Sequence, residues 1–353
     1  MNLEDLGYSD FFESGRKQAS LDDFAIARVI AEHRESYRIL NVTGERTAKI
    51  TGKQMFRALS REDYPAVGDW VAVTELNAEQ AVIRGVLPRR TVLKRKESGG
   101  SDAQIIAANV DVAFIVQAVG RDFSINRFER YAAMITSGGV RPSIILNKFD
   151  LISKSELDGM VSEIKTRLPE VDVLATSVVS EGGLDNLTAQ LEKGKTYCFV
   201  GSSGVGKSSI INELFGEKIL ATKQISSQTN RGRHVTTTRA LFVLNGGAMV
   251  IDNPGMRELG ILDSESGIGK VFDEIIEIAK SCKFSDCTHA NESGSAVRAA
   301  IRSGILDEKR YESYEKLKRE NEFHDMTNIE KRKKDHAFGK FIKKAKEQIE
   351  KYK

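Results

Sequence analysis

The sequence predicts three folded parts: an N-terminal β-barrel, a central α/β domain with a mostly parallel sheet, and a C-terminal, mainly helical domain. The chain has 353 residues, which is more than one typical domain. Short β-branched segments fill residues 24–97, whereas apolar strands alternate with helical stretches after about residue 105. Beyond about residue 268 the pattern is helical.

The N-terminal part is predicted to be an OB-fold barrel over residues 24–97, preceded by a tail of residues 1–23. Its expected strands are FAIARVI, YRILNV, RTAKITG, DWVAVTEL and AVIRGVL, and turns that contain Gly or Pro separate them. Short strands in this number suit such a barrel, and OB-folds bind oligonucleotides on one face. Trp70 is expected in the core rather than as a stacking platform for a base.

The central part is predicted over residues 98–270. The continuous apolar run VDVAFIVQAV is typical of a buried parallel strand. The elements expected after it are a helix at RFERYAAMITSGG, a strand at PSIILN, a helix near 154–168, a strand at VDVLATS, a helix near 183–193 and a strand at TYCFVG. A polar loop over 217–239 follows, and LFVL and AMVID resume the sheet. Residues 271–353 are the third part, which ends in a basic tail.

Charge and composition limit the class of protein and of partner. The net charge is only +3, but basic residues gather in 24–96 and in 331–353, on either side of an acidic middle. This pattern favours a polyanion such as RNA, although a merely solvated basic surface has the same composition. No apolar run reaches about 18 residues and the N-terminus lacks a signal pattern, so we expect no membrane span and a cytoplasmic protein. The 3 cysteines do not make a disulfide framework.

A phosphate-binding loop is the strongest motif. GSSGVGKS, between the strand TYCFV and the expected helix SSIINELF, fits G-x-x-x-x-G-K-[ST]. Backbone N–H groups of such a loop surround phosphate oxygens, and the helix N-terminus adds favourable partial charge. Lys207 is expected to reach the β- and γ-phosphates, and the Ser208 hydroxyl to bind Mg²⁺. The nucleotide-binding residues predicted here are Gly201, Ser202, Ser203, Gly204, Val205, Gly206, Lys207, Ser208 and Ser209.

A second motif selects the base. Asn147, Lys148 and Asp150 belong to NKFD, which follows the strand PSIIL and therefore lies where ligands bind in open α/β sheets. A carboxylate at Asp150 can accept both guanine donors, N1–H and the exocyclic amine, whereas adenine would leave it unpaired. Lys148 is expected along the base and sugar, and Asn147 is expected to tie this loop to the phosphate loop. Ser177, in ATS after the next strand, is expected to complete the base pocket.

Two further segments are expected to sense the γ-phosphate. Asp252 and Gly255 belong to DNPG, which fits D-x-x-G; Asp252 would hold Mg²⁺ through water, and the Gly255 N–H would meet the γ-phosphate. The preceding RGRHVTTT occupies the position of a switch I loop, where Thr236 or Thr237 would bind Mg²⁺. Either segment could also be an ordinary loop.

The hydrolytic step lacks its usual water-orienting glutamine, because Met256 follows D-x-x-G. Slow intrinsic hydrolysis is therefore expected, with His234 as a candidate polar group or, equally, a surface histidine. The base motif precedes the phosphate loop, so the order is circularly permuted. The chain after DNPG then runs directly into the C-terminal part. The state of the bound nucleotide could therefore change the position of that part.

A possible metal cluster lies in that C-terminal part. Cys282, Cys287 and His289 have a spacing that suits tetrahedral Zn²⁺, and buried thiols with a capping histidine are the alternative. Ser295 occupies the region where a fourth ligand is expected, and serine is a poor zinc ligand.

The order of these motifs resembles the RsgA (YjeQ/YloQ) family of ribosome small-subunit-dependent GTPases. The motifs are, in order, NKFD, GSSGVGKSS, GRHVTTT, DNPG and CKFSDCTH. The resemblance runs from about residue 24 to the C-terminus and includes VGDWV and LPRR. It implies an OB-fold, a circularly permuted GTPase domain and a C-terminal zinc domain. It also implies a bacterial cytoplasmic enzyme whose GTP hydrolysis is stimulated by the small (30S) subunit, late in maturation of that subunit.

The sequence departs from the family pattern at two positions. Asn253 stands where the family has threonine in D-T-P-G, and we expect little change from it. Ser295, in SGSAV, stands where the family has its last cysteine ligand. Zinc would then be held more weakly, by three protein ligands plus water or a nearby group, or be absent, with the fold held by packing.

Three functions are compatible with these observations. The first is a Mg²⁺-dependent GTPase acting on the 30S subunit and its 16S rRNA, expected as a monomer. The second is an rRNA-binding switch that uses GTP as a ligand with little turnover. The third is a P-loop ATPase or metabolite kinase, against which Asp150 argues.

Overall fold

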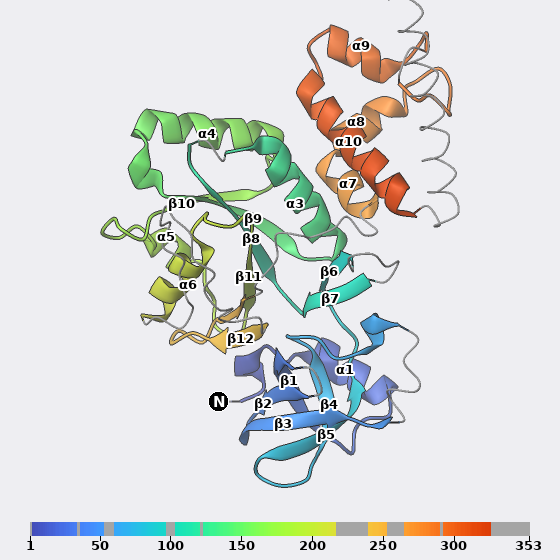
Figure 1. Cartoon of the computed structure of the whole chain (residues 1–353). Coiled ribbons are helices and arrows are strands. Elements are labelled where there is room, and N and C mark those ends of the chain that lie inside the picture. The colour runs from blue at the N-terminus through green and yellow to red at the C-terminus, as the bar shows by residue number, and fades with distance from the viewer. Residues whose placement is uncertain are drawn as a thin grey trace, which may run out of the picture.

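The computed structural model describes residues 2–33, 36–52, 60–96, 103–120, 123–216, 239–252, 265–289 and 292–325. Figure 1 shows a barrel at one end, a central α/β layer, and a group of helices at the other end. Within the described residues no helix is both long and apolar enough to cross a membrane.

The barrel contains the five predicted strands, β1 (Ala25–Glu32), β2 (Tyr37–Asn41), β3 (Gly44–Ile50), β4 (Trp70–Glu75) and β5 (Gln80–Val86). They pair in the closed order β1-β2-β3-β5-β4-β1, and β3 and β5 are the parallel pair. This closed five-stranded arrangement confirms the expected OB-fold class. Trp70 is fully buried, so its expected place in the core is confirmed.

The N-terminal segment, expected as a tail, packs against the barrel. It forms a 3₁₀ turn, η1 (Glu4–Leu6), and a helix, α1 (Asp10–Gln18). Its apolar side chains Leu6 and Phe12 are buried, and the ring of Phe12 lies 6.0 Å from that of Trp70. The fully buried Arg28 of β1 donates to the Leu6 carbonyl, so both apolar and polar contacts hold the segment in place.

The central sheet contains five parallel strands and one antiparallel strand. The parallel strands are β8 (Val112–Ala118), β9 (Arg141–Asn147), β10 (Asp172–Thr176), β11 (Thr196–Val200) and β13 (Met249–Asp252), and β12 (Ala240–Val243) is antiparallel. The spatial order is β10-β9-β8-β11-β13-β12, and pairing of Ala31 with Ala240 joins this sheet to the barrel. The continuous apolar strands are buried because the sheet is covered, as their composition predicted.

Helices cover the central sheet: α3 (Ile125–Ser137), α4 (Lys154–Arg167), α5 (Asp185–Thr188) and α6 (Lys207–Phe215), with 3₁₀ turns η2 (Arg61–Asp63) and η3 (Phe149–Leu151) elsewhere. The helix expected near 183–193 is wrong in length, because α5 has only 4 residues. The Tyr197 hydroxyl donates to the Gln190 carbonyl and accepts from the Glu192 N–H, groups that a longer helix would need. A hairpin of β6 (Val92–Lys96) and β7 (Ala103–Ala108) was not anticipated.

The C-terminal part is helical as predicted, with α7 (Glu265–Val271), α8 (Asp273–Ala279), α9 (Ala296–Arg302) and α10 (Glu308–Asp325). These helices lie beside α3 and away from the barrel (Figure 1). Gly267 of α7 sits so close to α3 that an added Cβ would lie 2.0 Å from the Ala133 carbonyl oxygen. Glycine at this position therefore sets the close approach of the two helices.

A buried ion network joins the central part to the C-terminal helices. Glu129 of α3 has no exposed surface, and its carboxylate accepts from Arg167 Nε at 2.8 Å and Nη2 at 2.9 Å. The same carboxylate accepts from Arg310 Nη1 of α10 at 2.8 Å. At the edge of this interface Arg130 also pairs with Glu320, at 2.6 Å. Helix α3 is thus bound to α10 through both buried and half-buried charges.

Candidate nucleotide site and metal centre

The predicted nucleotide motifs meet at one edge of the central sheet. NKFD follows β9, ATS ends β10, the phosphate loop (residues 201–206) follows β11, and Asp252 ends β13. Because these four strands are parallel, their carboxyl ends lie on the same side, where open α/β sheets bind ligands. The topology therefore brings together segments that are up to about 100 residues apart.

The phosphate loop has the backbone that its glycines predict. Gly206 has a φ of 101°, and an added Cβ there would lie 2.2 Å from Asn147 Nδ2. An added Cβ on Gly201, whose φ is 141°, would lie 2.2 Å from the Val116 carbonyl oxygen. A side chain at either position would force the loop away from the neighbouring strand ends.

Asn147 joins the base-recognition loop to the phosphate loop. Its amide Nδ2 donates to the Val205 carbonyl at 2.8 Å, and its Oδ1 accepts from Thr176 Oγ1 at 2.9 Å. Asn147 is buried, so these bonds satisfy polar atoms that water does not reach. Next to it Lys148, with a φ of 65°, donates from Nζ to the Gly204 carbonyl at 3.0 Å. Two consecutive side chains of NKFD thus bind the loop that would hold phosphate.

Asp150 is exposed and oriented by its neighbour. The Ser177 hydroxyl, which is buried, donates to Asp150 Oδ1 at 2.5 Å. The same hydroxyl accepts weakly from the Val179 and Ser180 N–H groups, both at 3.3 Å. The carboxylate therefore has one lone pair engaged and the rest of its surface open to a ligand, which suits recognition of two donors on a base edge.

The charged and hydroxyl groups that are expected to bind phosphate and Mg²⁺ lie around the start of α6. Lys207, its first residue, donates from Nζ to the carbonyls of Gly201 at 2.8 Å and Ser202 at 2.7 Å. Ser208 and Ser209 are half-buried in the first turn, and Ser203 is exposed. Asp252 is half-buried; burial raises the pKa of its carboxyl, and the charge of Lys207 opposes that rise. An anion and a divalent cation would both find complementary charge here.

Some predicted residues fall outside the described part of the chain. They are His234, Thr236, Thr237, Asn253, Gly255 and Met256. The structure adds a residue that the motifs did not reveal: Arg127, in the first turn of α3, lies with Nη1 3.4 Å from Ser202 Oγ. No sequence signal marks it, because its proximity to the phosphate loop arises from the packing of α3 on β8 and β9.

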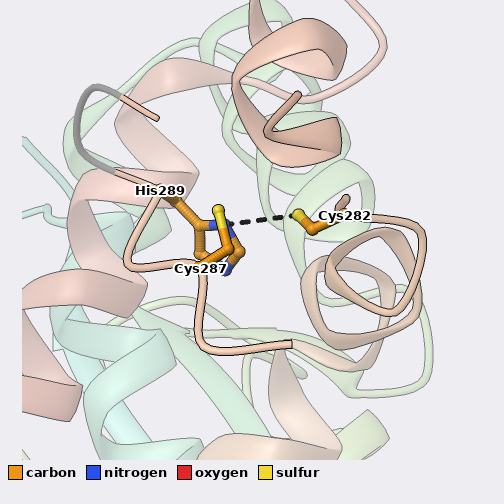
Figure 2. Close-up of side chains that lie close together, drawn as sticks. All are labelled: Cys282, Cys287 and His289. Atoms are coloured by element: carbon orange, nitrogen blue, oxygen red, sulfur yellow. Dashed lines mark hydrogen bonds between the residues drawn. The ribbon is translucent and has the colours of Figure 1, made fainter. Parts of the chain in front are cut away.

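The predicted metal cluster converges in space. One ligand atom each from Cys282, Cys287 and His289 lies within 4.8 Å of the others, in the segment between α8 and α9 (Figure 2). Cys282 Sγ lies 3.5 Å from His289 Nδ1, and Ser295 Oγ lies 3.4 Å from the same nitrogen. Thiolates and an imidazole are donors that zinc prefers, so this set fits the metal.

The protonation of the cluster also suits a metal. Burial by itself raises the pKa of the Cys282 thiol, but N–H groups of Val297 and Ala296 favour the thiolate, and the pKa is lowered overall. The Ala296 N–H donates to this sulfur at 3.2 Å. Burial lowers the pKa of His289, which favours the neutral imidazole that binds metal ions.

Comparisons with known proteins agree with this geometry. A model described as RsgA GTPase matches residues 86–262. Small ribosomal subunit biogenesis GTPase RsgA 2 of Lactiplantibacillus plantarum is 42% identical over 316 residues, which cover 89% of each chain. Small ribosomal subunit biogenesis GTPase RsgA of Opitutus terrae is 40% identical, covering 92% of this chain and 90% of its own.

Solved structures give the same result for the fold. YjeQ from Thermotoga maritima matches with a TM-score of 0.62 at 27% identity, covering 83% of this chain and 96% of that chain. YloQ, described as a circularly permuted GTPase, matches with a TM-score of 0.61 at 25% identity, covering 86% of this chain and 97% of that chain.

Proposed function

This chain belongs to the RsgA GTPase family, and from that premise we propose that it hydrolyses GTP on the small ribosomal subunit during biogenesis of that subunit. As a member of a GTPase family it is a GTP-hydrolysing enzyme, and the family uses Mg²⁺ with GTP and GDP. The observation that carries the proposal is the bond between Asn147 and the Val205 carbonyl, which fixes the base-recognition loop against the phosphate loop.

Each polar group of the site has a proposed role in binding. Asp150, held by Ser177, accepts the two donors of guanine, and the aliphatic part of Lys148 lies along the base and sugar. Lys207 exchanges its bonds to loop carbonyls for the β- and γ-phosphates. Ser208, and Asp252 through water, would hold Mg²⁺, which would neutralise charge on the phosphates and so assist transfer to water.

The residues predicted to sense the γ-phosphate complete the proposed site. By their motifs, Thr236 or Thr237 would bind Mg²⁺ and the Gly255 N–H would meet the γ-phosphate. His234 is the proposed group that would position water, since Met256 has no side-chain group to do so. These segments adjoin β12 and β13, and β12 pairs with β1 of the barrel. A change at the γ-phosphate would therefore act on strands that contact the barrel.

The barrel and the C-terminal region are proposed to bind 16S rRNA as parts of a monomer. Exposed cations on the barrel include Lys49, Arg84 and Arg38, the last of which pairs with Glu45, and the tail over 331–353 is strongly basic. Residues 24–97, 98–270 and 271–353 would then act as RNA-binding, GTPase and metal-binding domains of a cytoplasmic protein. Affinity for the subunit should fall as salt rises, because each phosphate contact releases counterions.

Zinc is the proposed metal of the C-terminal region, held by Cys282, Cys287 and His289. It would connect the end of α8 to the start of α9, across a segment with few buried apolar side chains. In this role the metal stabilises the fold and takes no part in the hydrolysis of GTP.

Co-sedimentation with purified ribosomal subunits tests the partner. We expect the protein to sediment with small subunits in the presence of a slowly hydrolysed GTP analogue, and less with GDP. Large subunits are the control, and binding should weaken as potassium chloride increases. Equal sedimentation with both subunits, or no effect of nucleotide, would contradict the proposal.

A further inference from the structure

Ser295 is placed as the fourth member of the metal cluster. It is buried, with 3% of its surface exposed, at the N-cap of α9. Its Oγ lies 3.4 Å from His289 Nδ1, the same nitrogen that lies 3.5 Å from Cys282 Sγ. Two different side chains thus face one imidazole nitrogen from separate elements of the chain.

These two separations agree with the edges of a tetrahedron around zinc. With Zn–S of about 2.3 Å, and Zn–N and Zn–O of about 2.1 Å, a regular tetrahedron has a sulfur-to-nitrogen edge of about 3.6 Å. The corresponding nitrogen-to-oxygen edge is about 3.4 Å. The observed distances from Nδ1 to Cys282 Sγ and to Ser295 Oγ match both edges within about 0.1 Å. Both separations are therefore those expected with Ser295 Oγ at the fourth corner of the coordination shell.

We propose that this corner is an exchangeable coordination position: its oxygen donor, the Ser295 hydroxyl or a water bound to it, is weakly held, and an external thiolate can replace it. Because Ser295 is buried whereas Cys282 and Cys287 are half-buried, the thiolate would reach the metal from the side of the two cysteines. A neutral hydroxyl is a much weaker zinc ligand than a thiolate, because it adds no negative charge. Two thiolates already balance the charge of Zn²⁺, so the set of Cys282, Cys287 and His289 is neutral when loaded. A third thiolate from outside adds a strong donor in place of a weak one.

The capping bond of Ser295 is compatible with this role. The Arg298 N–H donates to Ser295 Oγ at 3.3 Å, which uses one lone pair of the hydroxyl oxygen. The hydroxyl proton faces the Cys282 sulfur and His289 Nδ1, and the second lone pair remains for a metal or for a metal-bound water. A serine that only caps α9 would stabilise the helix equally with and without metal, whereas a serine that also binds the metal would not.

This inference rests on the proposed metal centre and is independent of GTP hydrolysis. Its test uses the full-length protein loaded with Co²⁺ in place of Zn²⁺, and 2-mercaptoethanol as the external thiol. The thiolate-to-cobalt absorption reports the number of bound thiolates. In the natural protein it should increase by about half when thiol is added, as two thiolates become three. In Ser295→Cys it should begin at the higher value and not change.

Zinc affinity gives the second measurement. Competition with a chelator should show that Ser295→Cys binds Zn²⁺ about tenfold or more tightly than the natural protein, because a thiolate replaces a weak donor. Ser303→Cys, an exposed cysteine near the end of α9, is the matched control and should bind as the natural protein does. Far-UV circular dichroism and GTP binding check that each variant is folded.

Two results would overturn the inference while leaving the metal centre intact. They are cobalt absorption in the natural protein that does not respond to thiol, and equal zinc affinity of the natural protein and Ser295→Cys. Failure of both proteins to bind Zn²⁺ or Co²⁺ would overturn the inference and the metal centre together. The thiol titration of the natural protein needs no variant, so it decides the matter even if Ser295→Cys does not fold.

Discussion

Glu129→Gln is expected to loosen the attachment of the C-terminal helices to the central part by about 3 kcal/mol. Breaking a buried ion pair by removing one partner typically costs about 3–5 kcal/mol, since the remaining charges are left buried. Here the carboxylate is fully buried and faces Arg167 and Arg310, whose side chains are 11% and 9% exposed. The lower end applies because Arg310 keeps Glu274, Arg167 keeps Asp307 at 3.8 Å, and the glutamine oxygen still accepts one bond.

Hydrogen exchange of the α10 amides measures this change locally, without requiring that the whole chain unfold in one step. A loss of about 3 kcal/mol makes exchange through opening of this interface about 10²-fold faster. Glu320→Gln is the matched control on the same pair of helices, because the Arg130–Glu320 pair is 35% and 28% exposed. Such a pair contributes about 0–1 kcal/mol, so exchange should rise less than about sixfold. Equal exchange in the two variants would refute the reasoning.

Three predictions concern the nucleotide site. Asp150→Ala should lower the preference for GTP over ATP by about 10³-fold in competition binding, because it removes the acceptor for both guanine donors. An unchanged preference would contradict the proposed base pocket. Asn147→Ala should lower the free energy of unfolding in urea by about 1–3 kcal/mol, because it leaves the Val205 carbonyl unpaired, and it should weaken binding of GTP and GDP equally. Nucleotide affinity equal to that of the natural protein would argue against the role of Asn147 in joining the two loops. Affinity for Mg²⁺·GTP should fall as pH is lowered through the raised pKa of Asp252, because protonation removes the charge that attracts the cation, and a calorimetric pH series should show no such fall in Asp252→Asn.

The local parts of the fold were predictable because they depend on neighbouring residues in the sequence. All five barrel strands and the strands of the central sheet appear where β-branched and apolar runs predicted them. The contact between Asn147 and the phosphate loop was also anticipated, since both segments carry recognisable motifs at the ends of parallel strands.

The features that were missed depend on contacts between distant residues. Glu129 has the appearance of a surface residue in an amphipathic helix, but its partners Arg167 and Arg310 are 38 and 181 residues away. The segment that contains η1 and α1 is predicted only as a tail, because its buried apolar residues Leu6 and Phe12 find their partners only in the folded barrel. Arg127 approaches Ser202 for a similar reason, 75 residues along the chain. Periodicity cannot reveal such pairs, because it reports only which face of an element is apolar.

Helix α3 connects the nucleotide site to the C-terminal helices. Its first turn approaches the phosphate loop through Arg127, and two residues later Glu129 contacts α10. Helix α3 therefore contacts both the phosphate loop and the C-terminal helices, and it joins these two parts physically.

Steady-state GTP hydrolysis with and without purified small ribosomal subunits tests the central claim. The protein alone should hydrolyse GTP slowly, because Met256 replaces the usual glutamine, and small subunits should raise the rate by about 10-fold or more. ATP and large subunits are the controls, and neither should support or stimulate turnover. Tight binding of GTP with no stimulation by small subunits would contradict the account and favour an rRNA-binding switch that uses GTP only as a ligand.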